Sequence, residues 1–190
     1  MIFRENNDEQ RLAKRLRNGE NGAMETFYTL YAERLAGVCS RYVIDQEDMK
    51  DVFQNAFLSI ITHIGEFEYR GEGSLLAWAK KIVVSEALRF LRTVRRQELM
   101  LLDRDITEES EEDDPPVSDL PPEVIHQMVS QLPTGYRAVL NLYVFENRNH
   151  QEIARLLGIQ ERTSASQLCR AKNLLAKMIQ QFNDDNNPRR

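Results

Sequence analysis

The sequence of 190 residues contains little cysteine and little histidine, and each scarcity excludes a class of site. Its two cysteines, Cys39 and Cys169, lie far apart, and its three histidines form no spaced cluster. This argues against a structural zinc site or a disulfide framework, so we predict no metal and no other cofactor. No apolar run approaches the roughly 20 residues that cross a bilayer, and the first residues lack the apolar core of a signal peptide. We therefore expect a cytoplasmic protein with no direct membrane insertion.

Sequence motifs of catalysis are also missing. The chain contains no glycine-rich phosphate loop of the Walker type, no Gly-x-Ser-x-Gly and no His-Glu-x-x-His. Its densest acidic stretch is too crowded and too well solvated to provide two carboxylates with tuned pKa values. We therefore predict that the protein is not an enzyme.

Charge is unevenly distributed along the chain. The net charge is −5, yet residues 103–123 hold ten acidic residues against one arginine, which gives this stretch −9. The rest of the chain therefore carries +4, and two segments, 75–98 and 147–177, each have a net charge of +4. Clustered basic residues are typical of nucleic-acid binders, although two ordinary solvated helix faces would show the same charges.

Composition divides the chain into three parts. The middle part, 101–122, is poor in apolar residues and contains two Pro-Pro pairs. Such a segment cannot bury enough surface to offset the entropy of ordering it. We therefore predict a helical N-terminal domain at 1–100, an acidic flexible linker at 101–122 and a helical C-terminal domain at 123–190.

In the first domain, apolar residues recur at steps of three and four, which is the period of a helix with one buried face. This pattern covers 23–42, 52–61 and 75–94. The run 65–74 contains three glycines and is expected to be a loop.

The second domain shows a short helical pattern followed by a turn signal. Ile153, Ala154 and Leu157 are spaced as the core side of a helix, and Gly158 follows at the position that favours a left-handed residue. A longer amphipathic helix is predicted to begin near Glu161. Together these features predict a helix-turn-helix, and hence an all-α fold of two small helical domains joined by the acidic linker.

The second helix of a helix-turn-helix enters the major groove with its N-terminal part. Arg, Gln, Ser and Thr side chains can bond base edges there, and cations further along suit phosphates. A solvated surface face is the alternative. The candidate residues are Arg162, Thr163, Ser164, Ser166, Gln167, Arg170 and Lys172.

Aromatic and basic residues also lie close together in the glycine-rich loop and the helix after it. Aromatic rings beside cations suit unstacked single-stranded bases, because stacking accepts any base and cations follow the backbone. The alternative is that Phe67 and Trp78 belong to the core. The residues concerned are Phe67, Tyr69, Trp78, Lys80, Lys81 and Arg89.

Three motifs occur in a fixed order. The first is residues 48–58 (DMKDVFQNAFL), and the second is 67–82 (FEYRGEGSLLAWAKKI). The third joins 132–140 (LPTGYRAVL), 150–159 (HQEIARLLGI) and 163–172 (TSASQLCRAK). With these motifs the chain resembles the bacterial RNA polymerase sigma factors of the sigma-70 family, in particular the small two-domain extracytoplasmic-function (ECF) subfamily.

The resemblance implies a factor that binds core RNA polymerase, directs it to promoter DNA and helps to melt the minus-ten region; an anti-sigma factor is a further expected partner. It implies that the first motif docks core polymerase through Asp48, Asp51, Gln54, Asn55 and Phe57. It implies that 162–172 reads the minus-thirty-five element. It also implies a minus-ten site, formed by Arg70, Gly71, Glu72, Ser74, Trp78, Lys80, Lys81, Ser85, Arg89 and Arg92.

Two other functions fit parts of the pattern. A stand-alone helix-turn-helix regulator would bind an operator without polymerase, usually as a dimer. An anti-sigma or other protein-binding adaptor would make no DNA contact. The acidic first motif and the aromatic loop favour a sigma factor, because an operator binder needs neither.

Overall fold

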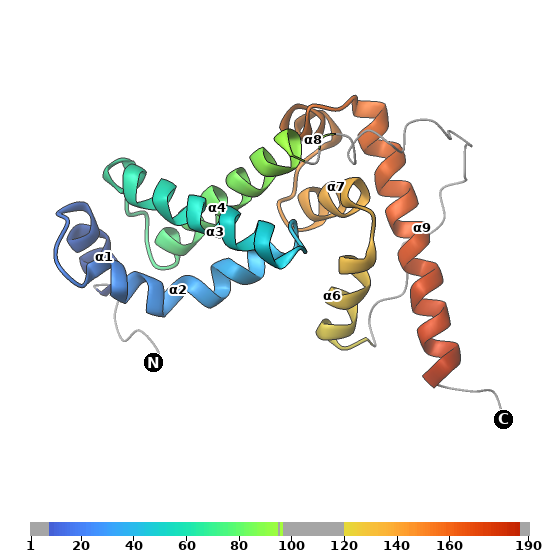
Figure 1. The fold of residues 1–190 in the computed structure, drawn as a ribbon, viewed down its shortest axis with the longest axis horizontal. Helices are drawn as coiled ribbons and strands as arrows, with labels where there is room; N and C mark the ends of the chain where they lie inside the picture. The colour runs from blue at the N-terminus through green and yellow to red at the C-terminus, as the bar shows by residue number, and fades with distance from the viewer. Residues whose placement is uncertain (1–7, 95, 97–119, 187–190) are drawn as a thin grey trace. The chain divides into compact units, whose positions relative to one another are not determined.

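The computed structural model describes residues 8–94, 96 and 120–186 (Figure 1). Within these residues all regular secondary structure is helical. The chain forms two compact units, Met1–Arg89 and Phe90–Arg190. The all-α prediction, with two helical units, is thereby confirmed. The predicted acidic linker lies outside the described residues up to position 119, so the boundaries at 100 and 122 stay predictions.

The first unit consists of three helices, a short 3-10 turn and most of a fourth helix. The fully buried core of this unit includes Phe27, Leu35, Ile60, Leu75 and Val83. The bounds are α1 Asp8–Arg17, α2 Ala23–Ser40, α3 Gln46–His63, η1 Ile64–Glu66 and α4 Ser74–Thr93.

One of these elements extends beyond its apolar pattern, and one differs from the sequence prediction. Helix α3 begins six residues before the apolar pattern of 52–61, because Asp45 caps it by accepting from the backbone N–H groups of Glu47 and Asp48, both at 3.0 Å. Helix α1 was not predicted at all. Its only buried apolar side chains are Leu12, Ala13 and Leu16, too few to give a periodic signal.

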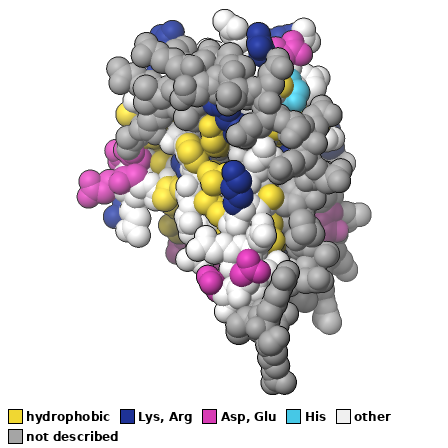
Figure 2. All heavy atoms as spheres, turned by 90° about the vertical axis from the view of Figure 1, so that its right-hand side faces the viewer, with side chains coloured by type: hydrophobic (Ala, Val, Ile, Leu, Met, Phe, Trp, Pro, Cys, Tyr) yellow, Lys and Arg dark blue, Asp and Glu magenta, His cyan; other side chains and the backbone are white. Residues whose placement is uncertain are grey.

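The described residues of the second unit include the end of α4 and the helices α6 to α9, with α7 and α8 packed against α9. Its fully buried core includes Val139, Leu142, Ile153 and Ala171. Figure 2 shows the side of this unit that carries α9, where hydrophobic side chains of the described residues gather in a central band. The bounds are α6 Pro122–Gln131, α7 Thr134–Val144, α8 His150–Leu157 and α9 Glu161–Asn186.

Helices α8 and α9 form the predicted helix-turn-helix. Asn149 and Glu152 make a reciprocal capping box at the start of α8. Gly158 ends the helix in the left-handed conformation, with φ 68° and ψ 35°, and its N–H donates to the carbonyl of Ala154. The role predicted for Gly158 is confirmed.

Candidate polymerase and nucleic-acid interfaces

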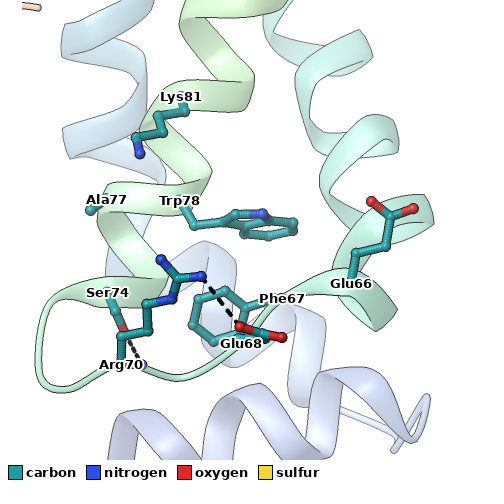
Figure 3. A pocket seen from close by; sticks show the side chains of 8 residues that line it. All are labelled: Glu66, Phe67, Glu68, Arg70, Ser74, Ala77, Trp78 and Lys81. Atoms are coloured by element: carbon teal, nitrogen blue, oxygen red, sulfur yellow. Dashed lines mark hydrogen bonds and ion pairs between the residues drawn. The ribbon is translucent and has the colours of Figure 1, made fainter.

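The glycine-rich loop and the first turns of α4 enclose a pocket of about 490 Å³ (Figure 3). The ring centroids of Phe67 and Trp78 are 5.4 Å apart, with planes tilted by 52°. Phe67 is buried, whereas Trp78 is only half-buried and lines the pocket. Phe67 is thus a core residue that supports the ring of Trp78, and Trp78 keeps a surface open to the pocket.

Charged side chains surround these rings. Arg70 and Lys81 line the pocket together with the carboxylates of Glu66 and Glu68. A guanidinium nitrogen of Arg70 lies 3.3 Å from Glu68 Oε2, but both side chains are largely exposed, so this ion pair contributes little to stability. Arg70 is therefore held only weakly by Glu68.

Ser74 has a structural task within the loop. Its hydroxyl donates to the carbonyl of Gly71 at 2.6 Å and accepts from the N–H of Arg70 at 3.3 Å. These two bonds close the loop just before α4 begins. In the structure, Ser74 shapes the loop that the predicted minus-ten residues Arg70, Gly71 and Glu72 occupy.

Helix α4 carries its exposed polar residues on one side. Its buried positions include Leu75, Ala79, Val83 and Ala87. Lys80 is half-exposed, and the exposed Arg89 forms an ion pair at 3.5 Å with Glu86, whose side chain is only 16% exposed. Continuing from Trp78 at steps of three or four, the exposed residues form what we call the α4 stripe: Lys81, Ser85, Arg89 and Arg92.

The residues predicted to dock polymerase lie on the outer side of α3. Asp51, Gln54 and Asn55 are exposed, and Asp48 is half-exposed. Phe57 is half-buried, and its ring centroid lies 4.9 Å from that of Phe53 and 5.3 Å from that of Tyr28 on α2.

This face continues into apolar residues that sequence reasoning missed. Tyr28, Leu58 and Ile61 are each about half exposed, at 54%, 56% and 48%. The pattern of 52–61 had placed Ile61 in the core, and that expectation is wrong. The signal lay in the spacing, because Gln54, Leu58 and Ile61 follow one another at steps of four and three on the outer side. We call Gln54, Leu58, Ile61 and Tyr28 the α3 face.

The predicted minus-thirty-five residues divide into two groups on α9. Arg162 is exposed, and Ser166, Arg170 and Lys172 are half-exposed. The second group is buried, with exposures of 4%, 0% and 2%: Thr163, Ser164 and Gln167.

Specific contacts explain the buried group. The Oγ of Ser164 lies 3.0 Å from His150 Nδ1 on α8. Gln167 lies so close to Gly135 on α7 that a methyl group there would come within 3.0 Å of its amide nitrogen. The structure therefore corrects the expected exposure of these side chains. Ser164 joins α9 to α8 of the motif, and Gln167 packs against α7.

Among the described residues, no group of three or more His, Cys, Asp or Glu side chains is arranged to hold a metal ion. In the same ranges, no helix combines the length and the apolarity needed to cross a membrane. Burial raises the pKa of the Cys39 thiol to about 11, so this cysteine is a protonated core residue at neutral pH.

The comparison with known proteins agrees with this architecture. Residues 27–97 match the family model described as Sigma-70 region 2, and residues 123–175 match that of Sigma-70, region 4. The chain is 27% identical to RNA polymerase sigma-H factor of Pseudomonas aeruginosa, over 90% of this chain and 94% of that protein. It is 30% identical to ECF RNA polymerase sigma factor SigM of Mycobacterium tuberculosis, over 83% of this chain and 76% of that protein.

Among solved structures, a complex of the sigma factor RpoE with the anti-sigma factor NepR from Bartonella quintana aligns with a TM-score of 0.47. The identity is 18%, over 84% of this chain and 98% of that chain.

The chain belongs to the ECF sigma factors of the sigma-70 family. Its function is accordingly that of a promoter-specific initiation factor for RNA polymerase.

Proposed function

We propose that helix α4 holds the melted minus-ten strand along the α4 stripe, with one unstacked base in the pocket of Trp78. The observation that carries this proposal is that the α4 stripe begins directly after the pocket, on the same helix. The stripe of Lys81, Ser85, Arg89 and Arg92 begins one turn after Trp78 and follows one side of a single helix. Cations at this spacing suit a phosphate backbone, and an exposed aromatic surface suits one base.

The pocket itself supplies the groups that an extruded base needs. Stacking on an aromatic side chain contributes about 1–3 kcal/mol per base, which is comparable with the cost of unstacking it. Glu68 and Arg70 at the rim offer an acceptor and a donor to the base edge. Gly71 and Glu72 belong to the same loop, and Lys80 lies at the edge of the stripe.

We infer that the α3 face, with Asp48, Asp51, Asn55 and Phe57 beside it, docks core polymerase. The face combines exposed apolar side chains with an acidic first turn, the composition expected for a hydrophobic interface centre with a polar rim. The aromatic contacts of Phe57 with Phe53 and Tyr28 fix the outline of this face.

For the second unit, we propose that Arg162, Ser166, Arg170 and Lys172 contact the minus-thirty-five duplex from α9. They are the members of the predicted set that reach the surface. We leave Thr163, Ser164 and Gln167 out of this contact because they pack inside the unit.

Three broader expectations belong to the same proposal. The protein performs no catalysis of its own, acts in the cytoplasm where its template lies, and is restrained by an anti-sigma factor. The residues that support a binding role are exposed cations and apolar groups.

The test is reconstitution with core RNA polymerase. The purified protein is mixed with core enzyme, and co-elution and run-off transcription on fragmented genomic DNA are measured in the same preparation. We expect co-elution and discrete start sites.

The double variant Lys81→Ala/Arg89→Ala should still co-elute but give fewer open complexes, whereas Lys14→Ala on α1 serves as the matched control. Co-elution without any loss in the double variant would overturn the minus-ten assignment. Specific duplex binding without polymerase would favour the stand-alone regulator.

A further inference from the structure

Helix α1 lies before residue 27, where the match to the family model begins, yet it contacts the loop that forms the pocket. Glu9 on α1 is only 5% exposed. Its carboxylate accepts from two backbone N–H groups, with Oε2 2.5 Å from the nitrogen of Gly73 and Oε1 2.5 Å from that of Leu75. The partners are 64 and 66 positions away in the sequence.

Helix α4 has no acidic residue of its own for this task. The residue before its start is Gly73, which has no side-chain acceptor, and its first turn contains no acid. The first N–H groups of a helix have no partner within the helix, and a carboxylate there also interacts favourably with the helix dipole. Glu9 therefore accepts hydrogen bonds from backbone N–H groups at the start of α4, as Asp45 does at the start of α3. Asp45 directly precedes its helix, whereas Glu9 belongs to a separate helix.

The other end of the loop is held by the same helix. The guanidinium of Arg17, in the last turn of α1, donates a hydrogen bond to the carbonyl of Phe67. Between these two attachments the backbone turns through Gly71 and Gly73, with φ values of 121° and 82°. Glycine adopts positive and negative φ about equally readily, so contacts from outside the loop are needed to hold it in one shape.

Neighbouring tyrosines respond to the charge of Glu9. Burial, and then the carboxylate of Glu9, raise the pKa of Tyr31 to about 12, against the opposing effect of Arg34. For Tyr69 in the loop, desolvation followed by Glu9 and Glu72 raises the pKa. The carboxylate thus lies close both to the core of the unit and to the loop.

We propose that Glu9 and Arg17 are positioning residues that give the base pocket its shape before DNA arrives. This rests on the proposed function of the pocket. A loop already held in its binding shape loses less conformational entropy on capture of a base, so affinity for the melted strand is higher. Neither side chain needs to touch DNA.

The first test measures the loop itself in the full-length protein. The variants Glu9→Gln and Arg17→Gln are compared with the matched controls Glu33→Gln and Arg11→Gln, which change exposed residues of α2 and α1. We expect amide hydrogen exchange at Gly73 and Leu75 to become about tenfold faster in Glu9→Gln, because each loses a bond to a charged acceptor. Trp78 is the only tryptophan of the chain, so its emission reports the pocket directly.

The second test measures binding by the holoenzyme to a single-stranded oligonucleotide of the minus-ten region. We expect both variants to weaken this binding several-fold, while co-elution with core polymerase and affinity for the minus-thirty-five duplex stay as in the controls. Arg17 is exposed, so its variant keeps the test valid if Glu9→Gln folds poorly. Unchanged exchange would overturn the holding role, and faster exchange without weaker binding would overturn the positioning role.

Failure of the proposed function gives a different result. In that case Lys81→Ala and Arg70→Ala would also leave oligonucleotide binding unchanged. Exchange at Gly73 and Leu75 would still separate Glu9→Gln from its control.

Discussion

The Nδ1 atom of His150 and the Oγ atom of Ser164 lie 3.0 Å apart, and this hydrogen bond joins the two helices of the helix-turn-helix. The His150 ring also stacks on Tyr143 at the end of α7, with centroids 5.2 Å apart and planes within 22°. One imidazole thus connects three helices. The angle at which α9 presents its exposed residues therefore depends on polar contacts inside the unit as well as on apolar packing.

Ser164→Ala should lower the free energy of unfolding of the second unit. The serine is fully buried, and its loss removes the hydrogen bond to the half-buried His150 ring, which costs about 1 kcal/mol. Urea unfolding followed by helical circular dichroism measures the change. Ser166→Ala is the matched control, since that hydroxyl donates to the carbonyl of Thr163 in its own helix and its loss should cost less. Equal losses in the two variants would contradict the prediction.

Gly135→Ala and Gly37→Ala should change stability in opposite directions. A methyl group at Gly135 comes within 3.0–3.2 Å of the Gln167 amide, so that side chain must shift at a cost of about 1–3 kcal/mol. At Gly37, in the last turn of α2, a methyl group meets nothing within 4 Å. Alanine there should stabilise the first unit by up to about 0.5–1 kcal/mol. Thermal unfolding of both variants measures the difference in sign.

Much of the fold could be predicted from the sequence because α2, α3 and α4 each bury an apolar stripe at helical spacing. The buried face of α9 could not be identified as readily. Polar residues occupy both sides of its first turns, so Ser164 and Ser166 look equivalent until α8 is in place. Periodicity distinguishes polar from apolar faces, but it cannot distinguish a buried polar face from an exposed one.

Helix α1 shows a second limit of sequence reasoning. Its role depends on Glu9 meeting backbone groups more than 60 positions away. Nothing around Glu9 distinguishes it from an ordinary surface carboxylate, since Asp8 precedes it and Gln10 follows. The sequence hints at this contact at the start of α4, where the helix follows a glycine and has no acidic residue in its first turn.

The capping box of α8 should give a pH-dependent contribution to stability. The N–H of Asn149 lowers the pKa of Glu152, with help from Arg148 and Arg155 and against a smaller desolvation effect. A carboxyl whose pKa is lower in the folded state stabilises the fold above its unfolded pKa, and this contribution disappears as pH falls through the folded value.

We therefore expect the difference in stability between the wild type and Glu152→Gln to shrink as pH falls below the ordinary range of a glutamate. Asn149→Ala should instead cost about 1 kcal/mol at every pH, because the amide does not titrate. Urea titrations between neutral pH and about pH 3 compare the two variants. A pH-independent effect of Glu152→Gln would contradict the capping assignment.

Leu58→Gln should weaken binding to core polymerase without changing the fold. The side chain is 56% exposed on the α3 face, so its replacement should alter the free energy of unfolding by no more than about 0.5 kcal/mol. The few residues that dominate an interface cluster near its centre and contribute more than 1 kcal/mol each, or about fivefold in affinity, and we expect Leu58 to be one of them. Ile44→Gln, an exposed apolar residue outside the helices, is the matched control. Competition between variant and wild type for limiting core enzyme measures the ratio.

Because α9 has an exposed and a buried group of polar residues, Arg162→Ala and Gln167→Ala should affect different properties. The first should change DNA binding, and the second should change stability. Arg162 is exposed at the start of the helix, so its loss should weaken binding to the minus-thirty-five duplex. If its contact is with a base, discrimination at one position falls by about 1–3 kcal/mol; if it is with a phosphate, all sequences weaken and the salt slope falls by about one.

Gln167→Ala should act through stability instead. The side chain is 2% exposed against α7, so its removal leaves a cavity and loosens the contact with Gly135. Affinity measured on the folded fraction should keep its sequence preference. Duplex binding by the holoenzyme over a series of single-base changes and salt concentrations, together with urea unfolding, separates the two variants. A changed base preference in Gln167→Ala at unchanged stability would show that this side chain turns outward on DNA, and the exposed group alone would then not define the contact.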